Sequence, residues 1–489
     1  MAKQVGTGTA GPAGDLRPAS AHPDDGVTVQ PVRAYLAARR GEFVDQLSEW
    51  VRLRSVDGVP EHEIDLVRSA QWLAAALRET GFPTVEVWDT EGAPAVYARW
   101  CAAPDAATVL IYSHHDVRAA KNEQWEQTPP FEPVLREGHL YGRGTSDAKG
   151  QVLAHLWGIR AQLATSGRAA PPVNLIVLVE GEEETGSTHL AQLLADNRSR
   201  LAADLVVYSD TMLWRADHPA VCTSLRGMVN AQIEIRGPLR DMHSGAVSGA
   251  APNPIVELSA LLGRLHDDQG RITLPGFYDD VAEPSRDRRA ELAALPFTEE
   301  DWLARSQTRG LAGEAGYTVP ERLFVRPSAE VLSVIAGDPV GVPRGAIPAV
   351  ARADLSIHTV ADQRIHDVAD QLRRWVGRNI NAGFDYTVTV DEHTAQEPYR
   401  TPPGHPTLHA LAEAMREAFG GPVGRMGNAG AGPAELLART LDAPVVFFGT
   451  GLLEDRWHDS DERASIDVLL AGAATLAHFW PRLAQIGQA

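Results

Sequence analysis

The sequence predicts an α/β fold in which a larger domain is interrupted by a smaller α+β domain. Up to about residue 225, short segments rich in Val, Leu and Ile alternate with segments of helical apolar spacing. This alternation is typical of a parallel sheet covered by helices. From about Arg226 a strand–helix–strand–helix–strand pattern replaces this alternation. The alternation returns after residue 395. We therefore expect one α/β domain from residues 30–225 and 396–489, with residues 226–395 inserted into it.

The elements of the larger domain follow from apolar spacing and from chain breakers. Helical spacing covers residues 32–53 and 63–80, and the second segment ends at Gly81-Phe82-Pro83. The remaining expected elements are strands at 84–88, 95–100, 108–112, 173–179, 204–208 and 444–448, and helices at 148–165, 188–195, 406–419, 433–439 and 465–480.

The inserted domain has a different texture. Its expected strands cover residues 228–236, 349–358 and 386–390, and its helices cover residues 255–265 and 365–376. Residues 266–330 are charged, carry many Pro and Gly, and contain no long apolar run, so we expect an elaborated insertion there.

The composition restricts the possible partners and the compartment. The net charge of −19 argues against nucleic acid or an anionic membrane as partner, because both reward basic patches. Only Cys101 and Cys222 are present, which gives no disulfide framework and predicts a reducing cytoplasm. No apolar run approaches the roughly 20 residues of a membrane helix, and no signal peptide is expected. Residues 1–29 are expected to form a disordered tail.

A cluster of acids follows the most apolar strand. The strand expected at residues 173–179 runs directly into Glu180, Glu182, Glu183 and Glu184. Clustered carboxylates at the end of a buried strand repel one another, and a multivalent cation would remove that cost. Taken alone, the cluster also fits a solvated acidic loop.

Other polar side chains also lie at strand ends or helix starts. His114 and Asp116 lie two residues apart at a strand end, so they point the same way. Asp147 precedes a helix, Asp210 ends a strand, and His458 lies in an acidic, Trp-flanked loop. Taken alone, each residue also fits a structural or surface role, as a strand-end His, a capping Asp or a surface His.

Together these positions predict a metal centre. Two His and three carboxylates are enough for two metals that share one carboxylate, and the set contains no thiolate. Such ligands suit zinc, or less well manganese or cobalt. Glu183 and Glu184 are adjacent and point to opposite sides, so one can bind metal while the other faces a bound water.

Five segments of the chain carry most of these polar residues. They are S-H-H-D-V, G-R-G-T-S-D-A-K-G, E-G-E-E-E-T-G-S, Y-S-D-T and D-M-H-S-G. These segments resemble the signature segments of metallopeptidase family twenty, and their spacing is similar to that of its carnosinase-like branch. The resemblance runs from about residue 32 to the C-terminus. It implies a zinc-binding catalytic domain with an inserted lid that often mediates dimerisation.

The resemblance implies a role for each metal ligand. Asp147 resembles the bridging ligand of two zinc ions. His114 and Asp210 would complete one zinc site, and Glu184 and His458 would complete the other.

The resemblance also implies roles for three residues that do not bind metal. Asp116 matches the carboxylate that orients the first His, and Glu183 matches the general base. His243 matches a lid histidine that reaches the partner subunit's active site and supports the developing oxyanion. Asp rather than Glu at position 210 resembles the aminopeptidase and dipeptidase branches, which favours substrates with a free amino group.

Two departures concern the substrate's carboxyl end. His358 stands where carnosinase-like members usually carry an Arg thought to hold the substrate carboxylate. The Gly-rich loop 427–432, which includes Gly430, replaces a Gly-Gly-Ser-type loop and lacks its hydroxyl but keeps backbone N–H donors.

The sequence therefore predicts a dinuclear zinc hydrolase that cleaves dipeptides or similar small peptides, acting as a homodimer through its lid. An N-acyl-amino-acid or carbamoyl amidohydrolase on the same scaffold is the enzymatic alternative. A metal-binding assembly protein without turnover is the alternative of another class, although it would need neither a general base nor an open metal position.

Overall fold

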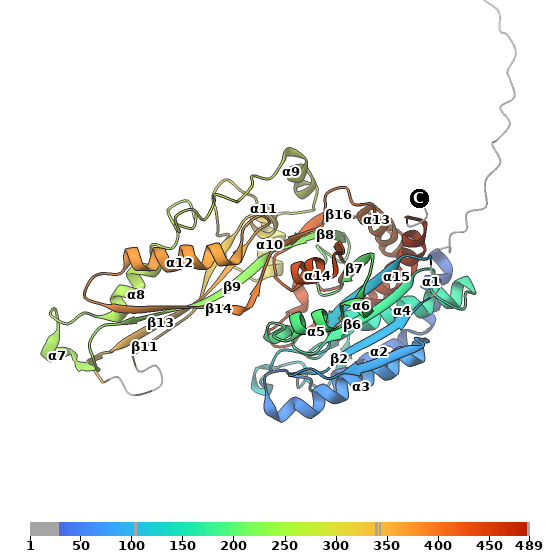
Figure 1. The fold of residues 1–489 in the computed structure, drawn as a ribbon, viewed down its shortest axis with the longest axis horizontal. Coiled ribbons are helices and arrows are strands. Elements are labelled where there is room, and N and C mark those ends of the chain that lie inside the picture. Colours follow the sequence, from blue (N-terminus) through green and yellow to red (C-terminus); the bar gives the residue numbers. More distant parts are fainter. Residues whose placement is uncertain (1–28, 102–104, 338–340, 342–343, 487–489) are drawn as a thin grey trace, which may run out of the picture.

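The computed structural model describes residues 29–101, 105–337, 341 and 344–486. The expected disordered tail lies outside these residues, except for Val29, where the first helix begins. The chain forms a large sheet covered by helices, from which a long four-stranded sheet extends to one side (Figure 1). None of the helices in the described part is long and apolar enough to cross a membrane.

The large sheet has nine strands, in the order β1-β2-β6-β3-β7-β17-β8-β15, with β16 also paired to β8. Its middle strands β6, β3, β7 and β17 are parallel, as the sequence predicts. The outer strands are mostly antiparallel, because short connections such as residues 89–94 can only join antiparallel neighbours. The strands are β1 (Thr84–Trp88), β2 (Ala95–Trp100), β3 (Thr108–His114), β6 (Asn174–Glu180), β7 (Leu205–Tyr208), β8 (Ala220–Leu225), β15 (Tyr399–Arg400), β16 (Gly424–Asn428) and β17 (Val445–Phe447).

Both faces of this sheet are buried. Alternate residues of β3 show this: Val109 and Ile111 join one apolar cluster, whereas Leu110 and Tyr112 join the other. One cluster includes the helices α1 (Val29–Ala38), α2 (Arg40–Val51), α3 (Glu63–Thr80), α4 (Lys149–Ser166), α13 (Pro406–Phe419) and α15 (Ile466–Ile486). The other includes α5 (Leu190–Asp196), the end of α6 (Arg198–Leu201) and α14 (Ala434–Leu441).

The lid, which we define as residues 226–395, contributes an antiparallel sheet in the order β11-β13-β9-β14. Two helices, α8 (Pro254–Leu262) and α12 (Ile365–Asn379), pack on it around a separate apolar core. The strands are β9 (Gly227–Arg236), β11 (Ser328–Ala336), β13 (Val350–Thr359) and β14 (Asp385–Gln396). At one end β10 (Met242–His243) pairs with β12 (Ala346–Ile347), next to α7 (Ser244–Val247). We propose residues 226–395 as the inserted domain and residues 30–225 and 396–489 as the two parts of the larger domain.

Some local expectations were wrong. Residues 32–53 form two helices that are separated at Arg39, and the Gly-rich segment 427–432 begins inside strand β16. The insertion at residues 266–330 ends in strand β11 after three short helices, α9 (Arg286–Ala293), α10 (Glu299–Ser306) and α11 (Val319–Phe324). The sequence also did not indicate the small sheet of β4 (Val134–Arg136), β5 (His139–Tyr141) and β18 (Arg463–Ser465).

Replacing Leu476 with Ala should destabilise the fold by about 2–5 kcal/mol, because this fully buried side chain of α15 would leave a cavity. The measurement is urea denaturation followed by tryptophan fluorescence. The control is Ile64→Ala in α3, where the side chain is 60% exposed and the loss should stay within about 0.5 kcal/mol. Equal losses in the two variants would contradict the buried position of α15.

Candidate metal centre and catalytic site

The candidate site lies at the carboxyl edge of the parallel strands. His114 ends β3 and is opposite Glu180, the last residue of β6. Asp210 follows β7, whose Tyr208 is opposite Tyr112 of β3. The carboxyl ends of these neighbouring strands therefore meet, which is where open α/β sheets bind ligands. Two loops and a short helical turn bring the remaining residues to the same edge.

The predicted metal ligands form two groups that share one carboxylate. His114, Asp147 and Asp210 form the first group, and Asp147, Glu184 and His458 form the second, with the ligand atoms of each group within 4.8 Å of one another. Nε2 of His114 lies 3.3 Å from Oδ1 of Asp147. Nε2 of His458 lies 3.0 Å from the other oxygen of Asp147 and 3.1 Å from Oε2 of Glu184. Asp147 therefore lies between the two imidazoles.

The donor atoms of these groups fit a pair of bound cations. Nε2 of His114, Oδ2 of Asp147 and Oδ1 of Asp210 are buried and have no hydrogen-bond partner among the described residues. Each lies 3.0–3.8 Å from another member of the two groups. Leaving such atoms buried and unsatisfied is costly, and mixed imidazole and carboxylate ligation is suited to zinc.

Burial and the short distances between these groups shift their pKa values. Burial opposes ionisation of Asp147, but the adjacent imidazoles of His114 and His458 lower its pKa. Burial disfavours the charged form of His458, whereas Asp147 and Glu184 raise its pKa. Burial and the nearby Asp210 raise the pKa of Glu183. A divalent cation would therefore have to displace protons, so its affinity should depend on pH.

Asp116 links the end of β3 to the acidic turn. Its Oδ1 lies 3.3 Å from Nδ1 of His114 and accepts a hydrogen bond from the backbone N–H of Glu183. Its Oδ2 accepts from the N–H of Glu184 at 2.9 Å. The fully buried Asp116 can therefore orient the first His and fix the turn that carries both glutamates.

Glu183 lies in the turn η3 (Glu183–Thr185) and is half-buried. Its carboxylate lies close to Gly432, where an added Cβ would be 3.8 Å from Oε1 of Glu183 and only 2.1 Å from the hydroxyl of Tyr208. Any side chain at position 432 would therefore clash with Tyr208 beside the candidate base.

Two further residues contact the site, and the sequence did not indicate either. Arg118 binds Glu184, with its Nε 2.9 Å from Oε2 and its backbone N–H donating to Oε1. Glu462 is fully buried and accepts hydrogen bonds from the backbone N–H groups of Gly144, Ser146 and Asp147 at 3.0–3.1 Å.

One ion pair and two side-chain hydrogen bonds also hold the loop that carries Asp147. Nη1 of Arg143 lies 2.8 Å from Oε2 of Glu462. The hydroxyl of Ser146 donates to Asp455 and accepts from the indole N–H of Trp457, the residue before His458. The loop that carries Asp147 and the loop that carries His458 are therefore tied together.

Three predicted residues lie apart from the two groups. His243 is exposed on β10, and α7, which begins at the next residue, lies at the end of the lid farthest from the large sheet (Figure 1). Burial and the neighbouring Arg226 lower the pKa of His358 to about 3, so this imidazole is neutral. Gly430 is exposed, and its carbonyl accepts a hydrogen bond from the backbone N–H of Arg226.

Comparison with known protein families matches residues 110–482 to the peptidase family M20/M25/M40, and the chain belongs to this family. This confirms the resemblance seen in the sequence segments. The chain is 26% identical to the human Beta-Ala-His dipeptidase over 478 residues, which cover 94% of this chain and 93% of that protein. It is also 26% identical to the cysteinylglycine-S-conjugate dipeptidase of Corynebacterium striatum over 389 residues, which cover 79% of this chain and 82% of that protein.

A solved structure supports the same family. The crystal structure of human carnosine dipeptidase 1 superimposes with a TM-score of 0.81 at 26% identity, covering 94% of this chain and 99% of that one. The predicted architecture, an α/β domain with a smaller inserted domain, is therefore confirmed.

Replacing Glu462 with Gln should weaken metal binding by at least about tenfold, because the loop that presents Asp147 would lose its buried anionic acceptor. The measurement is competition between the protein and a chelator for zinc. The control is Glu454→Gln, which removes a carboxylate that pairs with Arg305 instead. Unchanged zinc affinity in the Glu462 variant would show that the loop holds Asp147 without it.

Proposed function

We propose that this chain is a dinuclear metal-dependent hydrolase that cleaves dipeptides or similar small peptides. The observation that carries the proposal is the pair of ligand groups that share Asp147, with Glu183 beside them. Membership of a peptidase family and similarity to two dipeptidases over most of their length support the same reaction.

The resident metals are proposed to be two zinc ions per chain, with manganese or cobalt as substitutes. His114 and Asp210 would bind one ion, Glu184 and His458 the other, and Asp147 both. Bound there, the two ions supply a water of lowered pKa and polarise the scissile carbonyl.

The chain's own residues would handle protons and orientation. Glu183 would accept a proton from the attacking water and pass it to the leaving amine, which needs a carboxylate near the reacting atoms. Asp116 would keep the His114 ring and the Glu183 turn in place through its two hydrogen-bonded oxygens. His243 would bind the oxyanion that develops on the substrate.

We propose that the chain forms a homodimer through its lid, which would let His243 act in the partner's site. Strand β11 is an edge of the lid sheet, and its Val331, Leu332, Val334 and Ile335 are 39–65% exposed. Exposed apolar side chains on an edge strand favour pairing with another chain. A second copy bound there would bring another lid into the assembly, and with it a second His243.

We also keep the cytoplasm as the proposed location. Cys101 and Cys222 are both free, the first exposed and the second buried, which suits a reducing compartment.

Replacing Glu183 with Gln should lower dipeptide turnover by at least about 10²-fold while two metals per chain are retained, because the amide cannot accept the proton. The matched variant Glu184→Gln should lose metal instead. Steady-state kinetics and elemental analysis of zinc-reconstituted protein measure the two effects. An active Glu183 variant would show that another group is the base.

The same protein tests the substrate class. A dipeptidase hydrolyses peptides with a free amino group faster than N-acyl or N-carbamoyl amino acids, measured by kcat/KM with added zinc or manganese. The reverse preference would favour the amidohydrolase, and no turnover of either class in metal-loaded protein would favour an assembly protein.

Mixing two inactive variants should restore activity if His243 acts in the partner's site. Glu183→Gln protein and His243→Ala protein are combined under subunit exchange. One site of each mixed dimer would then contain an intact Glu183 and the partner chain's intact His243, so up to about one competent site per mixed dimer is expected. Mixing Glu183→Gln protein with the double variant is the control. Verified exchange without recovered activity would place His243 in its own chain's site or in a structural role.

A further inference from the structure

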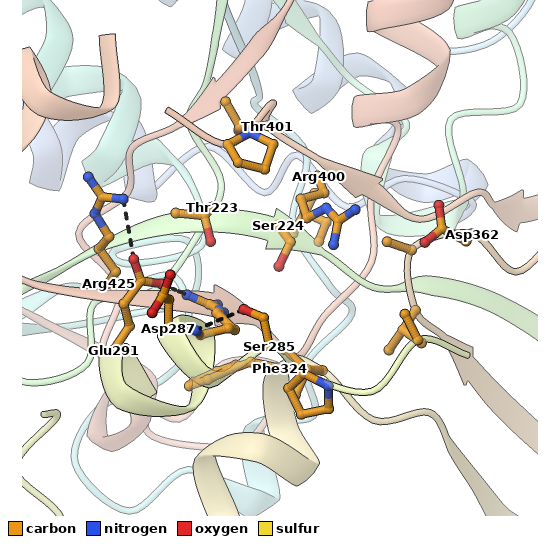
Figure 2. A pocket seen from close by; sticks show the side chains of 18 of the residues that line it. Thr223, Ser224, Ser285, Asp287, Glu291, Phe324, Asp362, Arg400, Thr401 and Arg425 are labelled. Carbon is orange, nitrogen blue, oxygen red and sulfur yellow. Dashed lines mark hydrogen bonds and ion pairs between the residues drawn. The ribbon is translucent and has the colours of Figure 1, made fainter. Parts of the chain in front are cut away.

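A second cavity lies where the lid joins the larger part of the chain. It encloses about 400 Å³, and its lining comes from β8, β15 and the segment after β15, and from the α9 region and the segment that follows β13 (Figure 2). None of the proposed metal ligands lines it, and neither does Glu183. It is therefore distinct from the candidate metal centre, and its volume suits a small ligand.

Arg226 supplies a buried positive charge in this lining. Its side chain is 7% exposed, and its Nε donates to the carbonyl of Ala429 at 2.7 Å. Its Nη1 donates to the hydroxyl of Ser328 at 3.1 Å. Within the described chain no carboxylate forms an ion pair with it, although the exposed Glu330 acts on its charge from farther away. Its Nη2 makes no hydrogen bond to the described residues. A buried guanidinium without a directly paired carboxylate is costly, so an anion in the cavity would stabilise it.

Of the other arginines that line the cavity, two are paired with a carboxylate and one is not. Arg288 and Arg425 both bind the carboxylate of Glu291, at 3.0 and 3.3 Å (Figure 2). Arg400 is exposed and makes no hydrogen bond or ion pair to the described residues, and Figure 2 shows it at the cavity. Arg226 and Arg400 are therefore the two guanidinium groups available to a ligand, and the fork of an Arg matches a carboxylate.

The rest of the lining is acidic, apolar or hydroxyl-bearing. Two aspartates, Asp287 and Asp362, are exposed on opposite sides of the cavity (Figure 2). Their carboxylates make no hydrogen bond within the described chain. Apolar residues form much of the wall between them. These residues are Leu225, Phe324, Val325, Val360 and Leu408.

We infer that this cavity binds an α-amino acid with an apolar side chain. The ligand carboxylate binds Arg226 and Arg400, its ammonium group faces an aspartate at the rim, and its side chain contacts the apolar wall. Such a ligand needs a positive and a negative partner around an apolar space, and the lining of the cavity provides all three. This inference does not rest on the proposed hydrolysis, because none of the groups involved takes part in it.

L-Phenylalanine tests the inference by isothermal titration calorimetry with metal-loaded protein near neutral pH. The dissociation constant should rise at least about tenfold in Arg400→Ala and in Arg226→Gln, because each variant removes a charged hydrogen bond to the carboxylate. The matched control is Arg378→Ala, an exposed arginine of α12 without a hydrogen bond to the described residues, which should bind as the wild type does. Phenethylamine, which lacks the carboxylate, should not bind.

Two results would overturn the inference. Phenylalanine binding that is unchanged in Arg400→Ala would exclude the cavity, and this exposed substitution should leave the fold intact even where Arg226→Gln does not. Binding that disappears only when the metals are removed would place the amino acid at the metal centre. Neither result depends on dipeptide hydrolysis, so failure here is distinguishable from failure of the proposed function.

Discussion

The close approach of three carboxylates and two imidazoles at the edge of the large sheet is the constraint on which the rest of the site depends. Parallel pairing places the ends of β3, β6 and β7 side by side, so the groups that follow them cannot separate. Like charges at this range repel, and burial strengthens the effect. Asp147 stabilises the cluster by lying between His114 and His458, and bound cations would do so further.

The loops around the cluster are fixed by buried carboxylates that do not themselves belong to either ligand group. Asp116 accepts the N–H groups of Glu183 and Glu184, and Glu462 accepts those of the loop that ends at Asp147. A carboxylate can accept several N–H groups at once, so one buried side chain fixes a whole turn. Arg143 compensates the charge of Glu462. Residues that are not themselves candidate metal ligands therefore fix the geometry of the candidate metal centre.

The sequence indicated the residues of the two groups and the supporting Asp116, but not Glu462 or Arg118. His114, Asp147 and Asp210 lie at strand ends or helix starts, and those positions follow from local apolar patterns. Glu462 contacts Arg143 across 319 residues of chain, and nothing in the local run S-D-E-R separates it from a surface acid. Strand β11 was missed for another reason: it is an edge strand with several exposed apolar residues, so its pattern does not alternate between core and solvent.

The junction between the lid and the larger part determines how His243 could reach a metal centre. Leu292 and Phe324 of the lid pack with Trp214 and Met426 of the larger part in one apolar cluster. Arg226 adds hydrogen bonds from the start of the lid to the loop at Ala429. A lid that bent far enough to bring its distal end to its own metals would have to break these contacts and expose their apolar surface. A second chain would supply His243 without that cost, which favours the proposed dimer over a bending lid.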